Sequence, residues 1–354
     1  MMKLRPEGSV GWKAAIVPRA RNVHVLAGSG AACAVAYVLL IHWLGQDYNL
    51  KSLTLLGAFA IATLGLALLL GITWQFSLAH AFFFALGAYG YAILGGAEYR
   101  WSPQSAAATA ILGGAVLAYV VGRVLLRLEG FYFAVATLGL TLIGENLLFV
   151  MRSYTGGDDG LPAPQLEVVG YAFDTPLRRY VIVSVVLAVG FAFAVNISRS
   201  AFGRSARAVA ADELMAGSNG IPVVSIKTRM FVISTVYATT GGVLYASASG
   251  YIFPTLSGLT TTLEFVVAVI VGGMGSLLGP VLVVAVIRWL PIVFEPLEGH
   301  VDLAYGSLLI ILLMVADGSG KRTGFLQGLK RRPSLRKRLH EEQSTPQSRP
   351  GGVQ

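Results

Sequence analysis

The sequence contains few strings of residues that could carry out chemistry, and each lacks a residue that its chemistry requires. Residues 318–323 (Gly-Ser-Gly-Lys-Arg-Thr) are similar to a phosphate-binding loop, but Val315 occupies the position of its first glycine and Arg322 follows the lysine. Residues 273–279 are glycine-rich, yet the last glycine is misplaced for a dinucleotide fingerprint. No two of the five histidines have the spacing of a metal site. The sequence therefore predicts no enzyme, and no metal or cofactor site.

Three charged residues within apolar runs are the remaining candidates for function. Glu145 lies in the middle of an apolar run, where an ionised carboxylate costs roughly 2.5–3.5 kcal/mol on membrane-insertion scales. It should therefore face a partner, a cavity or the interface. We expect either a role in a translocation path or gate, or a buried contact that fixes helix packing. Glu264 and Arg288 lie nearer the ends of their runs, so their side chains are expected to reach the interface.

The composition indicates which kind of element must position these residues. Of the 354 residues, 55% are hydrophobic and 13% are charged, against about 25% charged in soluble domains. The mean hydropathy is +0.67. The apolar residues come in blocks of about twenty, which is the length of a helix that crosses a bilayer core of roughly 30 Å. The sequence therefore predicts a membrane-embedded, all-α protein.

The apolar runs predict about ten transmembrane helices. They cover residues 25–45, 50–71, 74–96, 104–126, 130–151, 180–197, 229–249, 263–273, 280–294 and 302–317. An even number places both termini on one side. The two termini and the loops on their side of the membrane hold 21 of the 27 Lys and Arg residues. Because basic residues concentrate on the cytoplasmic side of membrane proteins, both termini are predicted to be cytoplasmic.

This topology divides the chain into three segments. Residues 1–24 form a cytoplasmic N-terminal segment, residues 25–317 the transmembrane domain, and residues 318–354 a basic, partly disordered cytoplasmic tail. Because the basic residues of the tail follow directly after the last span, we expect them to orient the chain and contact membrane lipid. The net charge of +9 is therefore no sign of nucleic-acid binding.

Small residues indicate how the helices pack. Five of them recur at every fourth position of one run, so they form a strip along one helix face: Ala106, Ala110, Gly114, Ala118 and Gly122. Such a strip lets a neighbouring backbone approach closely. The glycine-rich break at residues 272–280 is either a simple turn or part of a solute path, since irregular backbone at membrane depth must be shielded or line a cavity.

Two connecting segments have the character of docking sites. Residues 154–161, followed by Pro162 and Pro164, predict an irregular external loop. The internal loop, residues 198–228, contains a helix-favouring stretch from Arg204 to Met215 that Gly220 and Pro222 end. This basic helix is either an ordinary amphipathic connector or a lever that docks on a soluble partner.

Several blocks carry a family resemblance. Residues 200–209 (Ser-Ala-Phe-Gly-Arg-Ser-Ala-Arg-Ala-Val), 211–216 and 220–221 resemble the cytoplasmic coupling loop of LivM-type permeases, the inner-membrane subunits of ATP-driven (ABC) importers for branched-chain amino acids. Residues 75–89, 130–138, 155–161 and 272–280 are similar to further blocks of that family, in the same order, across about residues 50–315.

The resemblance implies a function and a set of partners. The chain would be a multi-pass permease subunit of the bacterial inner (plasma) membrane. It would pair with a second homologous permease subunit, two cytoplasmic ATPase subunits and a periplasmic or extracellular solute-binding protein. ATP would bind to the ATPase subunits, and the chain itself would need no cofactor. The solute would be a branched-chain amino acid. The alternatives are a same-family permease for urea, short amides or aromatic acids, an ion-coupled secondary transporter, and a membrane scaffold or receptor without transport.

The resemblance also implies roles for individual residues. The residues expected to couple the chain to its ATPases are Gly203, Arg204, Arg207, Glu213 and Gly220. The residues expected at the translocation path or its mouth are Glu145, Thr155, Gly156 and Gly157.

Overall fold

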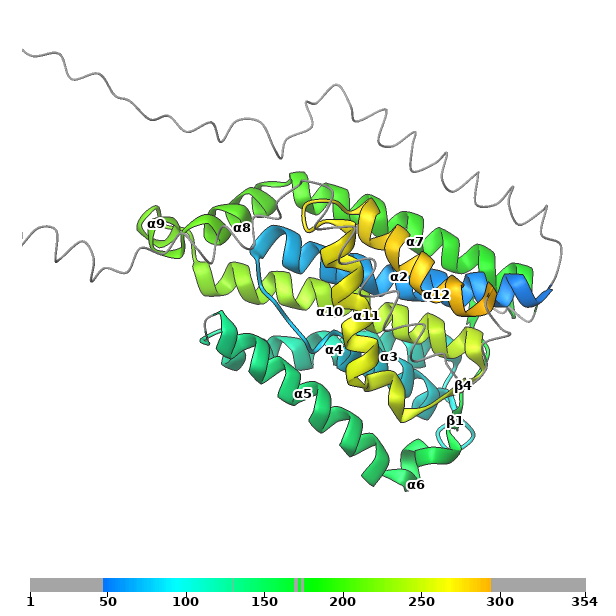
Figure 1. The fold of residues 1–354 in the computed structure, drawn as a ribbon. Helices are drawn as coiled ribbons and strands as arrows, with labels where there is room; N and C mark the ends of the chain where they lie inside the picture. Colours follow the sequence, from blue (N-terminus) through cyan, green and yellow to red (C-terminus); the bar gives the residue numbers. More distant parts are fainter. Residues whose placement is uncertain (1–46, 129, 169–170, 173–174, 294–354) are drawn as a thin grey trace, which may run out of the picture. The chain divides into compact units, whose positions relative to one another are not determined.

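The computed structural model describes residues 47–128, 130–168, 171–172 and 175–293 (Figure 1). The expected spans 25–45 and 302–317 lie outside the described residues, as do the N-terminal segment 1–24 and the tail 318–354.

Helices make up most of the described part of the chain (Figure 1). They are α2 (Asp47–Thr73), α3 (His80–Gly95), α4 (Pro103–Leu125), α5 (Phe131–Val150), α6 (Arg152–Thr155), α7 (Pro176–Arg199), α8 (Ala201–Ala211), α9 (Glu213–Ser218), α10 (Val223–Ser249), α11 (Leu259–Gly272) and α12 (Leu278–Val293), with the 3-10 turns η2 (Gly157–Asp159) and η3 (Pro254–Ser257). Two-residue strands pair antiparallel: β1 (Leu161–Pro162) with β4 (Tyr251–Ile252), and β2 (Glu167–Val168) with β3 (Tyr171–Ala172).

Five of these helices are long and apolar enough to cross a membrane: Leu50–Thr73, Pro103–Leu125, Phe131–Val150, Pro176–Arg199 and Val223–Ser249. Three shorter apolar helices, His80–Gly95, Leu259–Gly272 and Leu278–Trp289, accompany them. Each corresponds to one of the runs read from the sequence. The helices α7 and α10 begin earlier than expected, so Arg178 and Lys227 lie inside helices rather than in loops.

Helices α2 and α10 form the centre of the bundle. In the most apolar 18-residue stretch of α2, 89% of the residues are buried, whereas in that of α7 only 11% are buried. Helix α10 packs on α2, α3 and α4, and α2 packs also on α7 and α12. The outer faces of α4, α5 and α7 expose apolar side chains, which suits contact with lipid or with another membrane subunit.

Small residues set the distances between the central helices. The buried residues of α4 are the five of the predicted strip, which confirms the packing face read from the sequence. At Gly114, an added Cβ would lie 2.4 Å from Thr239 of α10. The crossing of α3 and α10 is closer still, since a Cβ at Gly242 would lie 1.9 Å from the carbonyl oxygen of Phe84. Here the two helices touch backbone to backbone.

Helix α3 follows an interruption inside the bundle. The run 74–96 was expected to be one span, but residues 74–79 are not helical and α3 begins at His80. The backbone of Leu78 in this segment is satisfied from α5: Leu78 N–H donates to Thr137 Oγ1 (2.9 Å), and Thr141 Oγ1 donates to the Leu78 carbonyl (2.6 Å). Because these side chains supply the two hydrogen bonds that Leu78 would have made in a helix, the chain can remain irregular at this residue.

A second interruption precedes α11. The chain leaves α10 through β4 and η3, and η3 packs against α3 and α5. After α11, the glycine-rich residues 273–277 reverse the chain into α12, and a Cβ at Gly279 would lie 1.9 Å from the Gly272 carbonyl oxygen. The predicted break is thus a turn that brings the two helices into backbone contact.

Candidate functional site

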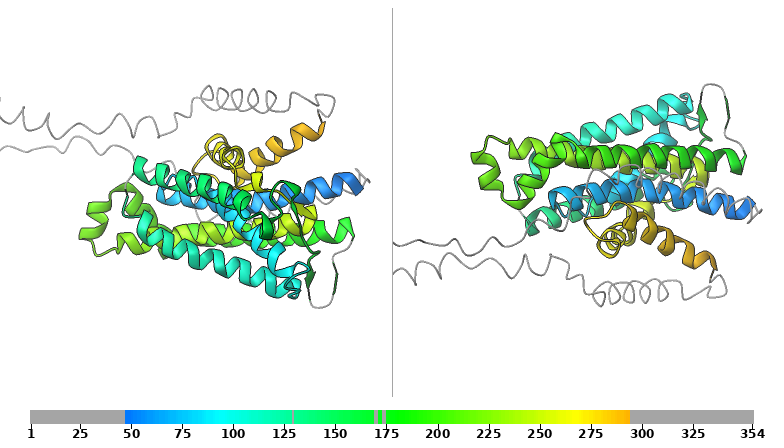
Figure 2. Two further views of the ribbon diagram at one scale, coloured as in Figure 1. Left: turned by 90° about the horizontal axis from the view of Figure 1, so that it is seen from below. Right: turned by 90° about the horizontal axis from the view of Figure 1, so that it is seen from above.

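The internal loop, residues 198–228, which we call the coupling segment, lies where α7 ends and α10 begins. The strands β1 and β4 lie at the opposite end of these two helices (Figures 1 and 2). The stretch from Arg204 to Met215 was expected to form one helix, and this prediction is wrong, since it is divided between α8 and α9. Asp212 separates them with an extended backbone, and its Oδ1 accepts a hydrogen bond from Met215 N–H (2.9 Å) as the N-cap of α9.

Helix α8 is held tightly against the end of α7. Ser200 caps α8 by accepting a hydrogen bond from Gly203 N–H (3.1 Å). A Cβ at Gly203 would lie 2.3 Å from the Ile197 carbonyl oxygen, so only glycine fits this approach. Arg207 donates to the Ser198 carbonyl (2.7 Å).

The exposed Arg204 makes a similar contact by donating to the Arg199 carbonyl (3.1 Å). Both guanidinium groups of α8 therefore satisfy carbonyl groups at the C-terminal end of α7, where positive charge is favourable.

Helix α9 is held to α10. Lys227 Nζ, from α10, donates to Glu213 Oε1 (2.5 Å). The lysine side chain is 11% exposed and the glutamate 46%. At the other end of α9, Gly220 has φ +77°, its N–H donates to the Gly217 carbonyl (2.9 Å), and Ile221 N–H donates to the Ala216 carbonyl (3.1 Å). This is the Schellman pattern, which needs a left-handed residue and so favours glycine.

The coupling candidates therefore share one small region, fastened to α7 on one side and α10 on the other. The sequence reading missed two features of it. Lys227 is not among the residues expected to couple the chain to its ATPases, and neither is the exposed pair Leu214 (85%) and Met215 (66%). The occurrence of two adjacent large apolar residues in a polar loop is the sequence signal that could have identified this pair.

The external loop lies at the other end of the bundle. Thr155 is buried and its Oγ1 donates to the Leu148 carbonyl (2.6 Å). Gly156 has φ +75°, and a Cβ there would lie 2.2 Å from the Gly160 carbonyl oxygen. A Cβ at Gly157 would lie 2.8 Å from the side chain of Arg152. All three candidates thus have a role in the shape of this loop.

An exposed ion pair adds to the external loop. Arg152 Nη2 donates to Asp159 Oδ2 (2.7 Å). This hydrogen bond, with the negative charge of the carboxylate, raises the pKa of Arg152 above its usual value. The antiparallel pairing of β1 with β4 then ties the loop to the segment that leads into α11.

Glu145 lies on α5 beside the start of α11. Its side chain is half-buried, and a Cβ at Gly258, the residue before α11, would lie 2.9 Å from Glu145 Oε1. The N-terminal end of a helix favours negative charge, so the start of α11 offsets part of the cost of burying this carboxylate. Glu145 is therefore placed beside the second interruption of the bundle.

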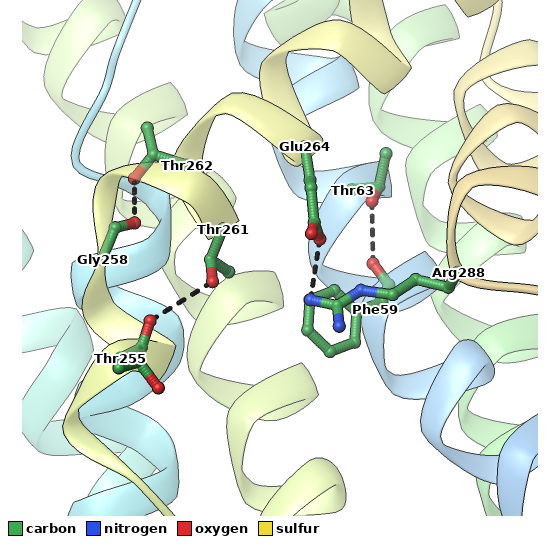
Figure 3. A network of polar contacts seen from close by, with 8 residues as sticks. All are labelled: Phe59, Thr63, Thr255, Gly258, Thr261, Thr262, Glu264 and Arg288. Carbon is green, nitrogen blue, oxygen red and sulfur yellow. Dashed lines mark hydrogen bonds and ion pairs between the residues drawn. The ribbon is translucent and has the colours of Figure 1, made fainter. Parts of the chain in front are cut away.

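Glu264 and Arg288 do not reach the interface as expected. They form an ion pair of 2.7 Å between α11 and α12, with side chains 8% and 27% exposed (Figure 3). The guanidinium carbon lies 3.6 Å from the ring centroid of Phe59 on α2. The sequence expectation failed because the partners are 24 residues apart and meet only through the α11–α12 hairpin. The described residues contain no group of side chains suited to a metal ion.

Comparisons with known proteins place these features in a family. Residues 48–316 match the family described as the permease component of branched-chain amino acid transport systems. The permease protein LivM of Salmonella typhimurium is 26% identical over 280 residues, covering 72% of this chain and 66% of the relative. LivM of Escherichia coli K12 is 27% identical over 286 residues, which cover 74% of this chain and 67% of the relative. LivH of the same strain is 24% identical over 303 residues, which cover 78% of this chain and 95% of the relative. The chain thus spans about two thirds of the LivM relatives. No solved structure matches.

Proposed function

Since this chain belongs to the family of permease components of branched-chain amino acid transport systems, we propose that it forms the membrane-spanning path of an ATP-driven importer for these amino acids in the bacterial inner membrane. Membership makes the chain a polytopic membrane protein with an ABC permease role, a transport component and not an enzyme. The proposal extends this to the solute, the compartment and the partners.

The observation that carries the proposal is the double attachment of the coupling segment. Gly203 and Arg207 fasten α8 to the end of α7, and Glu213 fastens α9 to α10 through Lys227. Force applied to α8 or α9 would therefore reach two membrane helices, one of which, α10, packs on α2, α3 and α4. This arrangement suits transmission between a cytoplasmic ATPase and the bundle.

The exposed pair on α9 supplies a contact for that ATPase. Leu214 and Met215 present large, exposed apolar side chains on α9. Large apolar anchors on a short helix are typical of helix-in-groove docking. We place one ATPase on this chain and the second on a homologous permease partner, which matches the similarity to both LivM and LivH.

The opposite end of the bundle suits a soluble receptor. The loop around Thr155, Gly156 and Gly157 is compact, and its exposed Arg152–Asp159 pair offers polar groups for docking. We assign this end to the solute-binding protein and Glu145 to the path beneath it. With the expected spans 25–45 and 302–317, the eight apolar helices of the described residues make ten, which keeps both termini cytoplasmic.

Purification of the tagged chain in mild detergent from its own host tests the proposal. We expect a second permease and an ATPase to travel with it, and the reconstituted complex to take up leucine with ATP hydrolysis when the binding protein is present. The double variant Leu214→Ser with Met215→Ser should lose the ATPase. The exposed apolar substitution Val116→Ser, on the outer face of α4, is the matched control and should retain it.

Two outcomes would overturn the proposal. A purified complex without an ATPase would remove the energy source. Uptake that collapses with an ionophore while ATP is held constant would instead establish an ion-coupled secondary transporter. If the complex is ATP-driven but the binding protein selects urea, a short amide or an aromatic acid, the mechanism stands and the solute assignment is wrong.

A further inference from the structure

The buried ion pair of Glu264 and Arg288 is not used by the coupling segment or the external loop. It lies where the α11–α12 hairpin meets α2 (Figure 3). Exchanging such a pair for apolar residues is often neutral or stabilising, because the cost of taking both charges from water offsets their attraction. Two charges inside a membrane bundle therefore indicate a function beyond packing.

The arginine has more hydrogen-bonding capacity than its partner uses. A guanidinium carries five N–H donors, and the described structure gives Arg288 one short contact, to Glu264 Oε2 at 2.7 Å. Its buried Nε has no acceptor among the described residues. Buried donors without partners are uncommon in proteins, and a functional role is one of their recognised explanations.

The surroundings of the pair are aromatic. Four rings from four helices, which we call the aromatic cluster, lie close together: Phe59 (α2), Phe84 (α3), Tyr245 (α10) and Phe265 (α11). The centroid separations are 4.8 Å for Phe59–Phe84 and 5.3 Å for Phe59–Phe265. Phe59 is the ring that the Arg288 guanidinium covers, so one charged pair adjoins one apolar surface.

The cluster also lies at the junction of the two interrupted helices. His80, the first residue of α3, lies 5.3 Å from Phe265, and Phe265 follows Glu264 on α11. Helices that begin inside a bundle after irregular backbone are the usual location of solute sites in membrane transporters.

From this placement we infer that Glu264 and Arg288 bind a zwitterionic amino acid with an apolar side chain. Arg288 takes the α-carboxylate, Glu264 takes the α-ammonium, and the aromatic cluster contacts the side chain. In the structure the two residues neutralise each other. A bound zwitterion, which is neutral overall, would pair its carboxylate with Arg288 and its ammonium with Glu264, so both charges are again compensated once it is bound. The inference rests on the proposed function, and it names residues in this chain that contact the solute.

Ligand binding to the purified full-length complex in nanodiscs, without the solute-binding protein, tests the inference. The probes are L-leucine, 3-methylbutylamine (which lacks the carboxylate) and 4-methylpentanoate (which lacks the ammonium). We expect leucine to raise the unfolding temperature and both analogues to have no effect. The variants Glu264→Gln and Arg288→Gln should each weaken leucine binding at least about tenfold, because they leave one charge of the ligand unpaired.

A matched control uses another arginine beside an aromatic ring. Arg123 on α4 donates to Tyr119 (2.6 Å) and is exposed, so Arg123→Gln should leave leucine binding unchanged. The double reversal, Glu264→Arg with Arg288→Glu, separates binding from packing. It should restore the unfolding temperature of the empty protein but not leucine binding, since the charges are then presented from the wrong helices.

Three binding results would overturn the inference: no leucine binding by the wild-type complex, equal binding of either analogue, or full leucine binding in the double reversal. ATP-driven uptake with the binding protein is measured on the same preparation. Normal uptake with an unchanged KM in Glu264→Gln and Arg288→Gln contradicts only this inference. Loss of ATP dependence in the wild type contradicts the proposed function instead.

Discussion

The backbone contact between α3 and α10 predicts that Gly242→Ala strongly destabilises the bundle. The new Cβ would lie 1.9 Å from the Phe84 carbonyl oxygen and 2.9 Å from Ala88 N, whereas ordinary contacts begin at 3.4 Å. The helices would have to separate locally by more than 1 Å, since a backbone carbonyl cannot rotate away. Overpacking of this kind costs about 1–3 kcal/mol, and we expect the upper end.

Gly113→Ala is the matched control, because a Cβ there meets nothing within 4 Å. Alanine is favoured over glycine in helices by about 1 kcal/mol, so this variant should be neutral or more stable. Because the gain from replacing glycine by alanine in a helix is common to both variants, they should differ by the overpacking cost alone, up to about 3 kcal/mol in the free energy of unfolding. Titration of the detergent-solubilised protein with dodecyl sulfate, followed by circular dichroism, measures this difference. Equal midpoints would mean that α3 and α10 do not cross at Gly242.

Three further predictions concern the coupling segment and the first interruption. Gly220→Val places a β-branched residue at φ +77°, at a cost of about 1–2 kcal/mol. This variant should lower the amount of solute carried per ATP hydrolysed, whereas the control Gly217→Ala should not. An unchanged ratio of solute to ATP in Gly220→Val would exclude the lever role of the coupling segment. Glu213→Gln leaves Lys227 without its countercharge, and uptake should fall more than ATPase activity; a parallel fall in both would indicate simple loss of folded protein. Thr141→Val removes the donor to a carbonyl of the irregular segment and should cost about 1–3 kcal/mol in the same titration; no loss of stability would show that water satisfies that carbonyl.

The chain's local patterns were enough to predict much of the fold. Helices form from hydrogen bonds between near neighbours, and membrane spans are set by runs of apolar residues, so the eight apolar helices of the described residues were visible in advance. The packing face of α4 was predictable for the same reason, since its small residues recur at a helical period. The location of the coupling segment followed from the basic loop between two spans.

Contacts between residues distant in the chain could not be predicted in this way. The irregular segment 74–79 depends on Thr137, which hydrogen-bonds Leu78 from 59 residues away. The attachment of α9 depends on Lys227, and the charge of Glu264 is balanced by Arg288 on the next helix. The local sequence around each of these residues gives no sign of its distant partner.

The amino-acid order by itself therefore determined where the membrane helices and the two connecting loops lie, because hydropathy and helix period act over a few neighbouring residues. Only the tertiary structure decided which backbone could stay irregular inside the bundle and which charges could be buried there. In an apolar medium those choices require a hydrogen-bonding or charged partner, and that partner comes from another helix.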